Sequence, residues 1–239
     1  MNNKHNVAGI PIEIVRKENL KNLYIRINPP NGDVIIVSPK NYPDEEIKLF
    51  VVKKLAEINK VRERMILQER QTKREYVSGE SYYLWGKPYR LQVIYEGNKY
   101  EITKQINKIV FKVPKNSTPK SKENAFNEWY RKELKRVLDI VSKDSQSKMN
   151  IYANEFRIKN MKTKWGTCNI EKKRIWINLQ LVKKPIECLE YVVIHELVHL
   201  IEKNHTHRFH ALVKEFYPGW KEAKKLLTEL PLEFWENGD

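Results

Sequence analysis

The sequence predicts an α+β fold in which a β-rich region with one long helix, residues 1–118, precedes a mainly helical region, residues 119–239. Short runs of alternating apolar and polar residues dominate the first part, and longer runs with helical apolar spacing dominate the second. A polar stretch at 114–121, which contains proline, lysine and serine, separates the two. The chain of 239 residues is long enough to bury a core without disulfide bonds.

The first part contains runs typical of β-strands, each bounded by turn-forming residues. Between the third and fourth runs, Pro43 and three acidic residues predict the start of a helix. Apolar residues then recur at helical spacing as far as Met65, which predicts one long helix. The predicted strands are residues 12–16, 23–27, 34–37, 89–95, 99–103 and 108–113.

The second part begins with a predicted helix from about 121 to 148, which has apolar residues along one side. Two short strands, 162–168 and 174–179, follow on either side of a turn. An apolar helix then leads into residues 195–205. Thr206 is a suitable cap for the next helix, and apolar spacing from Trp220 onwards indicates a last helix.

Residues 195–205 form the most informative pattern in the chain. His195 and His199 are four positions apart, so they share one helix face and can bind one metal ion. Glu196 lies beside them, and His205 follows six positions after His199. Three imidazoles with an adjacent carboxylate are typical of a catalytic zinc site with its own general base.

Two other interpretations compete with a catalytic site. The histidines could lie on the exposed face of an ordinary amphipathic helix, but residues 188–194 before them are too apolar for a solvated face. The metal could be purely structural, but such sites usually have four protein ligands, often cysteines. The sequence offers three ligands and a base, which favours catalysis.

The chain must turn back between His199 and His205. The metzincin pattern has a glycine midway, whereas this chain has Glu202 there, so no metzincin assignment follows. We expect Asn204 to make the turn, because asparagine tolerates the left-handed conformation that ends helices.

Four motifs, in this order, make the chain resemble the YgjP-like metallopeptidase family, distant relatives of the SprT-like and minimal gluzincin proteins. The resemblance covers most of the chain. It implies that the C-terminal half is a zincin-like metallopeptidase domain with a His-Glu-x-x-His active-site helix. The motifs are Ser78–Leu91, Lys164–Cys168, Ile177–Leu179 and Tyr191–His199 with its continuation to His205.

The resemblance also implies that His195, His199 and His205 bind Zn²⁺ and that Glu196 is the catalytic base. Bound zinc lowers the pKa of its water to about 7, and the glutamate takes the proton and later passes it to the leaving group. The expected activity is therefore hydrolysis of peptide bonds in a protein or peptide substrate.

Substrate-binding candidates lie in the motifs and after the third histidine. The family usually has arginine where Lys164 stands and serine where Thr167 stands, and lysine offers a point charge in place of a bidentate fork. We expect Cys168 to be a buried thiol near the site rather than a nucleophile. His207, Arg208, His210 and Tyr217 all could stabilise the oxyanion, and the sequence does not choose among them. The full set of binding candidates is Lys164, Trp165, Cys168, His210 and Tyr217.

The formal net charge of +15 leaves other functions open. A basic surface attracts polyanions, so the chain could associate with nucleic acid. A metal-dependent nucleoside triphosphate pyrophosphatase, with Lys162 and Lys164 binding the nucleotide, is one alternative to a peptidase. A nucleic-acid-binding module with a structural metal is another. A broad charge surplus without an aromatic stacking motif is weak support for either.

No apolar run approaches the length of a membrane span, and the N-terminus has no hydrophobic signal region. We therefore expect a cytoplasmic protein that has no membrane partner. The two cysteines, Cys168 and Cys188, are not expected to form a disulfide bond.

Overall fold

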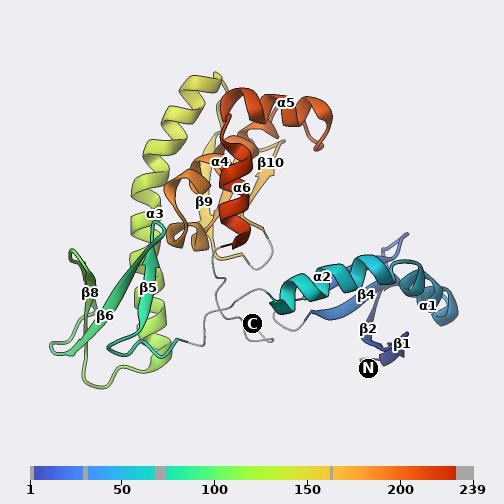
Figure 1. Ribbon diagram of the computed structural model, residues 1–239, viewed down its shortest axis with the longest axis horizontal. Helices are drawn as coiled ribbons and strands as arrows, with labels where there is room; N and C mark the ends of the chain where they lie inside the picture. Colours follow the sequence, from blue (N-terminus) through green and yellow to red (C-terminus); the bar gives the residue numbers. More distant parts are fainter. Residues whose placement is uncertain (1–2, 29–31, 68–73, 162–163, 230–239) are drawn as a thin grey trace. The chain divides into compact units, whose positions relative to one another are not determined.

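The computed structural model describes residues 3–28, 32–67, 74–161 and 164–229 (Figure 1). It has a mixed α+β architecture, as the sequence predicts. The contacts within the chain define two compact units, Met1–Arg74 and Glu75–Leu230. Each unit has its own hydrophobic core.

The first unit is a four-stranded sheet in the order β1-β2-β4-β3, with two helices on one face (Figure 1). β2 and β4 are parallel, and the two outer strands pair with them in antiparallel register. The core between sheet and helices is formed by buried aliphatic residues such as Ile36, Ile47 and Ile58. The elements are β1 (Asn3–Val7), β2 (Ile10–Lys17), β3 (Tyr24–Asn28), β4 (Asp33–Pro39), α1 (Asp44–Lys53) and α2 (Leu55–Leu67).

The single long helix expected in this region is two helices, which corrects the sequence prediction. Lys54 ends α1 with φ −101° and ψ 7°, outside the helical region, and α2 starts at the next residue. α1 contacts β1 and α2 contacts β3, the two edges of the twisted sheet. The break lets the helical segment follow both edges, and apolar spacing alone does not reveal such a bend.

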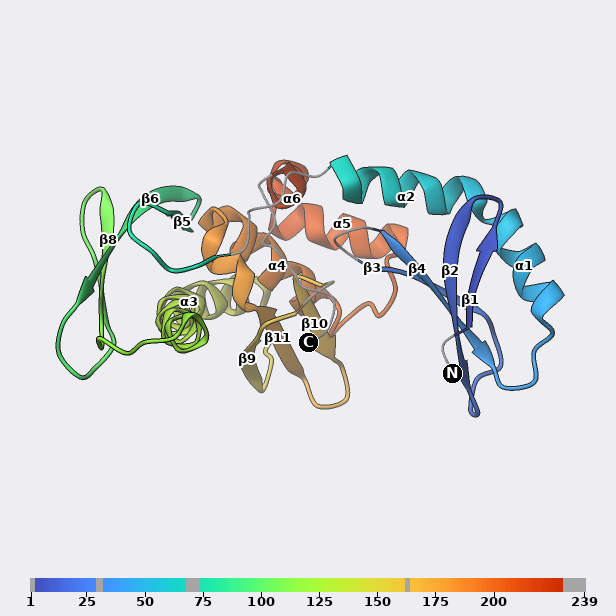
Figure 2. The same cartoon turned by 90° about the horizontal axis from the view of Figure 1, so that it is seen from below.

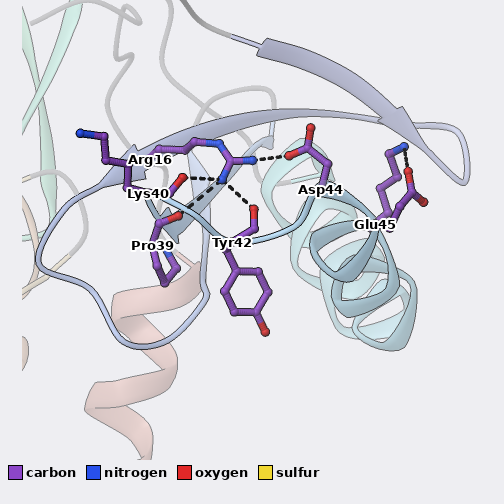
Figure 3. Close-up of polar contacts among 7 residues, drawn as sticks. Arg16, Pro39, Lys40, Tyr42, Asp44 and Glu45 are labelled. Atoms are coloured by element: carbon purple, nitrogen blue, oxygen red, sulfur yellow. Dashed lines mark hydrogen bonds and ion pairs between the residues drawn. The ribbon is translucent and has the colours of Figure 1, made fainter.

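Arg16 on β2 holds the loop that leads into α1 (Figure 3). Its guanidinium donates hydrogen bonds to the carbonyl oxygens of Lys40 at 2.9 Å and Tyr42 at 2.7 Å, and it forms an ion pair with Asp44. Pro43, the N-cap of α1, provides no side-chain cap. The arginine therefore fixes a helix start that lacks its own cap.

The second unit contains two sheets and the long helix α3, seen nearly end-on in Figure 2. One sheet has the order β5-β6-β8-β7 and the other β10-β11-β9. The helices predicted after Thr206 and from Trp220 are present. The elements are β5 (Ser81–Leu84), β6 (Lys87–Tyr95), β7 (Glu101–Lys104), β8 (Lys108–Val113), α3 (Pro119–Met149), β9 (Glu155–Lys159), β10 (Gly166–Asn169), β11 (Arg174–Asn178), the 3₁₀ helix η1 (Leu179–Lys183), α4 (Ile186–Val198), α5 (His207–Phe216) and α6 (Trp220–Glu229).

One core joins β5–β8 to the helices that follow them. Phe111 on β8, Phe126 on α3 and Leu197 on α4 belong to the same buried cluster. The chain therefore divides after Arg74, not between residues 118 and 119 as the composition suggested. The polar stretch near 114–121 is a surface connection within one unit, because the elements on both sides of it share that core.

Three strands have no counterpart in the sequence prediction: β1, β5 and β9. β1 has a single apolar residue, Val7, so its apolar alternation is weak, whereas β9 does alternate, with Phe156 and Ile158 between charged residues. Lys162, which the nucleotide alternative used, lies outside the described residues. Among the described helices, none is both long and apolar enough to cross a membrane.

Candidate metal centre

The helix that carries the His-Glu-x-x-His pattern, α4, lies in the middle of the second unit (Figures 1 and 2). It contacts α3, α5, α6, β10 and β11. Most of its residues are buried, including Leu189, Val193 and Leu197 at 0% exposure. A helix that is apolar on nearly all sides must be enclosed, and this carries its C-terminal histidines into the interior.

The chain leaves α4 without a left-handed residue. His199 is the C-cap, with φ −62° and ψ −17°, and the N–H groups of Ile201 and Glu202 donate to the carbonyl oxygen of Val198 at 2.9 Å. Asn204 has no positive φ, so the expected role of this residue is wrong. A tightened turn of helical bonds reverses the chain instead.

Three imidazoles converge at this turn. The Nε2 atoms of His195 and His205 are 3.1 Å apart. One ring nitrogen from each of His195, His199 and His205 lies within 4.8 Å of the other two. His195 and His199 are partly buried, and His205 is exposed. This group could hold a metal ion.

A hydrogen bond defines the tautomer of His199. Its Nδ1 lies 3.2 Å from the carbonyl oxygen of Glu202. Because a carbonyl oxygen can only accept, Nδ1 must carry the hydrogen, and the lone pair is left on Nε2. A backbone partner of this kind is typical of histidines that ligate metals.

Phe209 on α5 packs against all three imidazoles. Its ring centroid is 4.9 Å from that of His195 and 4.6 Å from those of His199 and His205. The side chain is 0% exposed. Thr206 caps α5 by accepting a hydrogen bond from the Phe209 N–H at 3.2 Å. The cap therefore fixes the start of α5, and with it the position of the Phe209 ring that packs against the histidines.

Burial changes the protonation of the site. Burial, together with the neighbouring His199 and His205, lowers the pKa of His195 to about 3, so this imidazole is neutral at pH 7. Glu196 is only 5% exposed, and burial raises its pKa to about 7 while the charge of Lys164 lowers it. The carboxyl group thus has a pKa close to that of an efficient general base at neutral pH.

A cavity of about 490 Å³ opens beside the histidines and Glu196. Lys164, Trp165 and Cys168, three of the binding candidates, line it. The other lining residues were not among the binding candidates, since nothing local distinguishes a cavity wall from ordinary core or surface. These are Gly166, Thr167, Ile170, Tyr191, Val192, Lys203 and Leu227.

His210 and Tyr217 are not among the residues that line this cavity. The His210 ring stacks on His205 and on Trp220, with centroid distances of 6.3 and 6.0 Å. The Tyr217 hydroxyl donates to the carbonyl oxygen of Glu187 at 3.2 Å, and burial with two nearby glutamates raises its pKa. Both residues brace the helices around the site.

Cys168 lies in the cavity wall as a free thiol. Burial, together with the nearby Glu196 carboxylate, raises its pKa to about 11. It is therefore protonated at pH 7, which agrees with the expectation of a thiol that is not a nucleophile. Cys188 is also free, and fully buried in α4.

Grouped histidines beside a buried carboxylate in an open cavity are typical of hydrolytic metalloenzymes. A model of the YgjP-like metallopeptidase domain matches residues 21–230, and the chain belongs to this family. The family resemblance stated from the motifs is therefore confirmed. The chain is accordingly a metallopeptidase, and the family implies a bound metal ion.

Two solved structures are similar to part of the chain. The metallopeptidase zymogen abylysin of Pyrococcus abyssi is 20% identical, and the match covers 41% of this chain and 99% of that chain with a TM-score of 0.36. The metallopeptidase zymogen jannalysin of Methanocaldococcus jannaschii is 23% identical, covering 38% and 92% with a TM-score of 0.34. No curated protein matches the sequence significantly.

Proposed function

We propose that the second unit is a zincin-like, zinc-dependent peptidase in which His195, His199 and His205 bind the metal and Glu196 is the general base. The observation that carries this proposal is the convergence of three imidazole nitrogens beside a buried carboxylate in one cavity. Peptide bonds of a protein or peptide are the proposed substrate.

The donor set fits zinc. Two nitrogens bound tetrahedrally at the usual zinc distance lie about 3.3 Å apart, and the Nε2 atoms of His195 and His205 are 3.1 Å apart. His195 is neutral because of burial, and His199 has its Nε2 lone pair free. Three histidines leave a position for water, which suits catalysis better than a closed structural site.

Zinc bound there would supply a Lewis acid and an acidified water. The residues of the chain would supply the rest of the chemistry. Glu196 accepts a proton on its carboxylate and returns it to the leaving amine. β10 is an edge strand of its sheet and lines the cavity, so an extended peptide can pair with it and present its carbonyl group to the site.

The two alternative functions that the basic charge left open gain no support. The family match concerns peptidases, and it gives no support to a nucleoside triphosphate pyrophosphatase or a nucleic-acid-binding module. Lys164 does line the cavity, where its charge acts on Glu196. We therefore assign it to the peptidase site.

The proposal is tested with Glu196→Gln, which keeps the size of the side chain and removes the base. The wild type and the variant are expected to hold about one zinc each by elemental analysis, while cleavage of an unstructured protein falls at least 10²-fold in the variant. Glu187→Gln, on the exposed side of the same helix, is the matched control and should retain activity. Zinc in both proteins with equal turnover would refute the role of Glu196, and turnover of nucleoside triphosphates alone would refute the peptidase.

A further inference from the structure

We propose that Gly166 is a positioning residue for Glu196: the space left by its missing side chain is where the Glu196 carboxyl group sits, and Asn178 holds the segment that brings Gly166 there. This inference rests on the proposed role of Glu196 as the general base. It gives a function to two motifs, Lys164–Cys168 and Ile177–Leu179, to which the proposed mechanism assigns no chemical step.

The pairing of β10 with β11 sets the direction in which position 166 points. Gly166 is opposite Ile177, and Cys168 is opposite Ile175. Directly opposed residues of an antiparallel pair project to the same face of the sheet. Both isoleucines are fully buried, and β10 packs against α4. A side chain at 166 would therefore point at the active-site helix.

The space at that point is already taken by Glu196. A Cβ atom added to Gly166 would lie 2.6 Å from Oε1, 2.7 Å from Cγ and 2.9 Å from Cδ of Glu196. Real Cβ atoms essentially never approach other heavy atoms closer than 3.0 Å. Even alanine at this position would force the carboxyl group or the strand to move.

Conformational freedom does not explain the glycine. Gly79 and Gly86 have positive φ angles of 98° and 77°, which other residues rarely adopt. Gly166 is absent from the residues with positive φ, and its backbone lies in a regular strand. Any residue could adopt its backbone conformation, so the requirement at this position is steric.

Asn178 prevents the strand from giving way. Its side-chain amide donates to the carbonyl oxygens of Met161 at 2.8 Å and Lys164 at 2.7 Å, and its Oδ1 accepts from the Met161 N–H at 3.2 Å. Its own N–H donates to the carbonyl oxygen of Trp165 at 2.9 Å. Asn178 is 4% exposed, so these bonds are shielded from water. The peptide groups on both sides of Trp165, the residue before Gly166, are thereby tied to β11.

The consequence is a defined position for the carboxyl group. The Gly166 backbone limits Glu196 on one side, and the buried helix α4 fixes where its side chain starts. A general base displaced by about 1 Å can lose on the order of 10²-fold in rate. The glycine therefore determines turnover through the position of Glu196.

The test is a double-mutant cycle between Gly166→Ala and Glu196→Ala, whose side chain lacks the Cγ, Cδ and Oε1 atoms that the added Cβ would meet. In the wild-type background, Gly166→Ala is expected to lower kcat about 10²-fold, with little change in KM and with zinc content retained. In the Glu196→Ala background, where only residual turnover remains, the same change should cost less than about threefold because the three atoms of the clash are absent. Gly219→Ala is the control, since the nearest atom to its added Cβ is 4.0 Å away.

A second readout does not depend on activity. In metal-free protein, Gly166→Ala is expected to lower the Tm with Glu196 present and to lower it less with alanine at 196. If Gly166→Ala does not fold, the double variant should still fold. Equal losses of kcat or Tm in both backgrounds, or a wild-type kcat for Gly166→Ala, would overturn the inference. Coupling in Tm alongside a Glu196→Gln protein that stays fully active would leave the contact intact and refute only the proposed function.

Discussion

At the scale of single residues, the buried carboxyl group of Glu196 has a measurable cost to stability. Burial raises its pKa from the ordinary 4.5 to about 7, so the folded metal-free protein binds more protons than the unfolded chain between these values. The stability contributed by the protonated group is present below pH 4.5 and is lost as the pH rises through 7. Above pH 7, Glu196→Gln should therefore be more stable than the wild type by roughly 3 kcal/mol, since one pKa unit is about 1.4 kcal/mol.

Thermal unfolding of the chelated proteins at pH 5 and pH 8 checks this expectation. The shift of His195 acts in the opposite sense, because its folded pKa of about 3 is below the ordinary 6.5 and its contribution is lost as the pH falls below that value. That contribution is the same in both proteins and cancels in the comparison. A Tm difference that does not change with pH would contradict the prediction.

The sequence predicts some residues of the candidate site and misses others. The candidate ligands and Glu196 follow from local spacing, because positions four apart on a helix meet without knowledge of the fold. Gly166 and Leu227 are separated from them in sequence and become neighbours only through tertiary packing. His210 was close to the ligands in sequence, yet its ring turns to Trp220 and lies outside the cavity lining.

At the scale of elements, α5 supports the proposed metal centre through Phe209. Phe209→Leu removes the ring that contacts all three imidazoles and is expected to weaken zinc binding 10- to 100-fold, as loss of an outer partner of a metal site does. Competition with a chromogenic chelator measures the affinity. Phe216→Leu, a partly buried residue on the same helix, should change it little. Equal zinc affinity for both variants and the wild type would show that the ring does not organise the histidines.

In the first unit, the start of α1 depends on the fork of Arg16. Arg16→Lys keeps the charge but cannot reach two carbonyl oxygens and a carboxylate with one planar group. We expect a loss of about 1 kcal/mol, since the group is partly exposed. Hydrogen exchange is the measurement. The α1 amides are expected to exchange faster in the variant than in the wild type, and the β2 amides are expected to change less. Unchanged exchange would mean that the acidic first turn is enough to stabilise the start of α1 without the arginine.

The sequence predicted several helix starts closely, including the start of α1 after Pro43, which has no side-chain cap. α3 begins at Pro119 after the cap Thr118, and α5 begins after Thr206, both within two residues of the expected starts. The break at Lys54 was missed because Ile47, Val51 and Ile58 keep helical spacing across it. What bends the segment is the sheet beneath it, and the sheet is assembled from strands distant in sequence.

At the scale of the whole molecule, the shared core of the second unit predicts where the chain can be divided. Tyr82, Leu84 and Phe111 from β5–β8 are buried in the same cluster as Phe126 and Leu197. A fragment of residues 119–239 lacks Tyr82, Leu84 and Phe111 and would expose the surfaces that they cover. Removal of large buried side chains costs about 2–5 kcal/mol each. A domain has only about 5–15 kcal/mol of stability to lose.

A fragment of residues 75–239 retains that entire core, and we expect it to unfold cooperatively and to bind one zinc. The 119–239 fragment contains all three histidines and Glu196, yet we expect it to lack a cooperative transition and to bind zinc at least tenfold more weakly. Thermal unfolding followed by circular dichroism, together with zinc titration, compares the two fragments. Cooperative unfolding of the shorter fragment would contradict the prediction, since it would mean that α3–α6 form a sufficient core without β5–β8. If the shorter fragment does not unfold cooperatively, the proposed chemistry of Glu196 has to be measured in the fragment of residues 75–239.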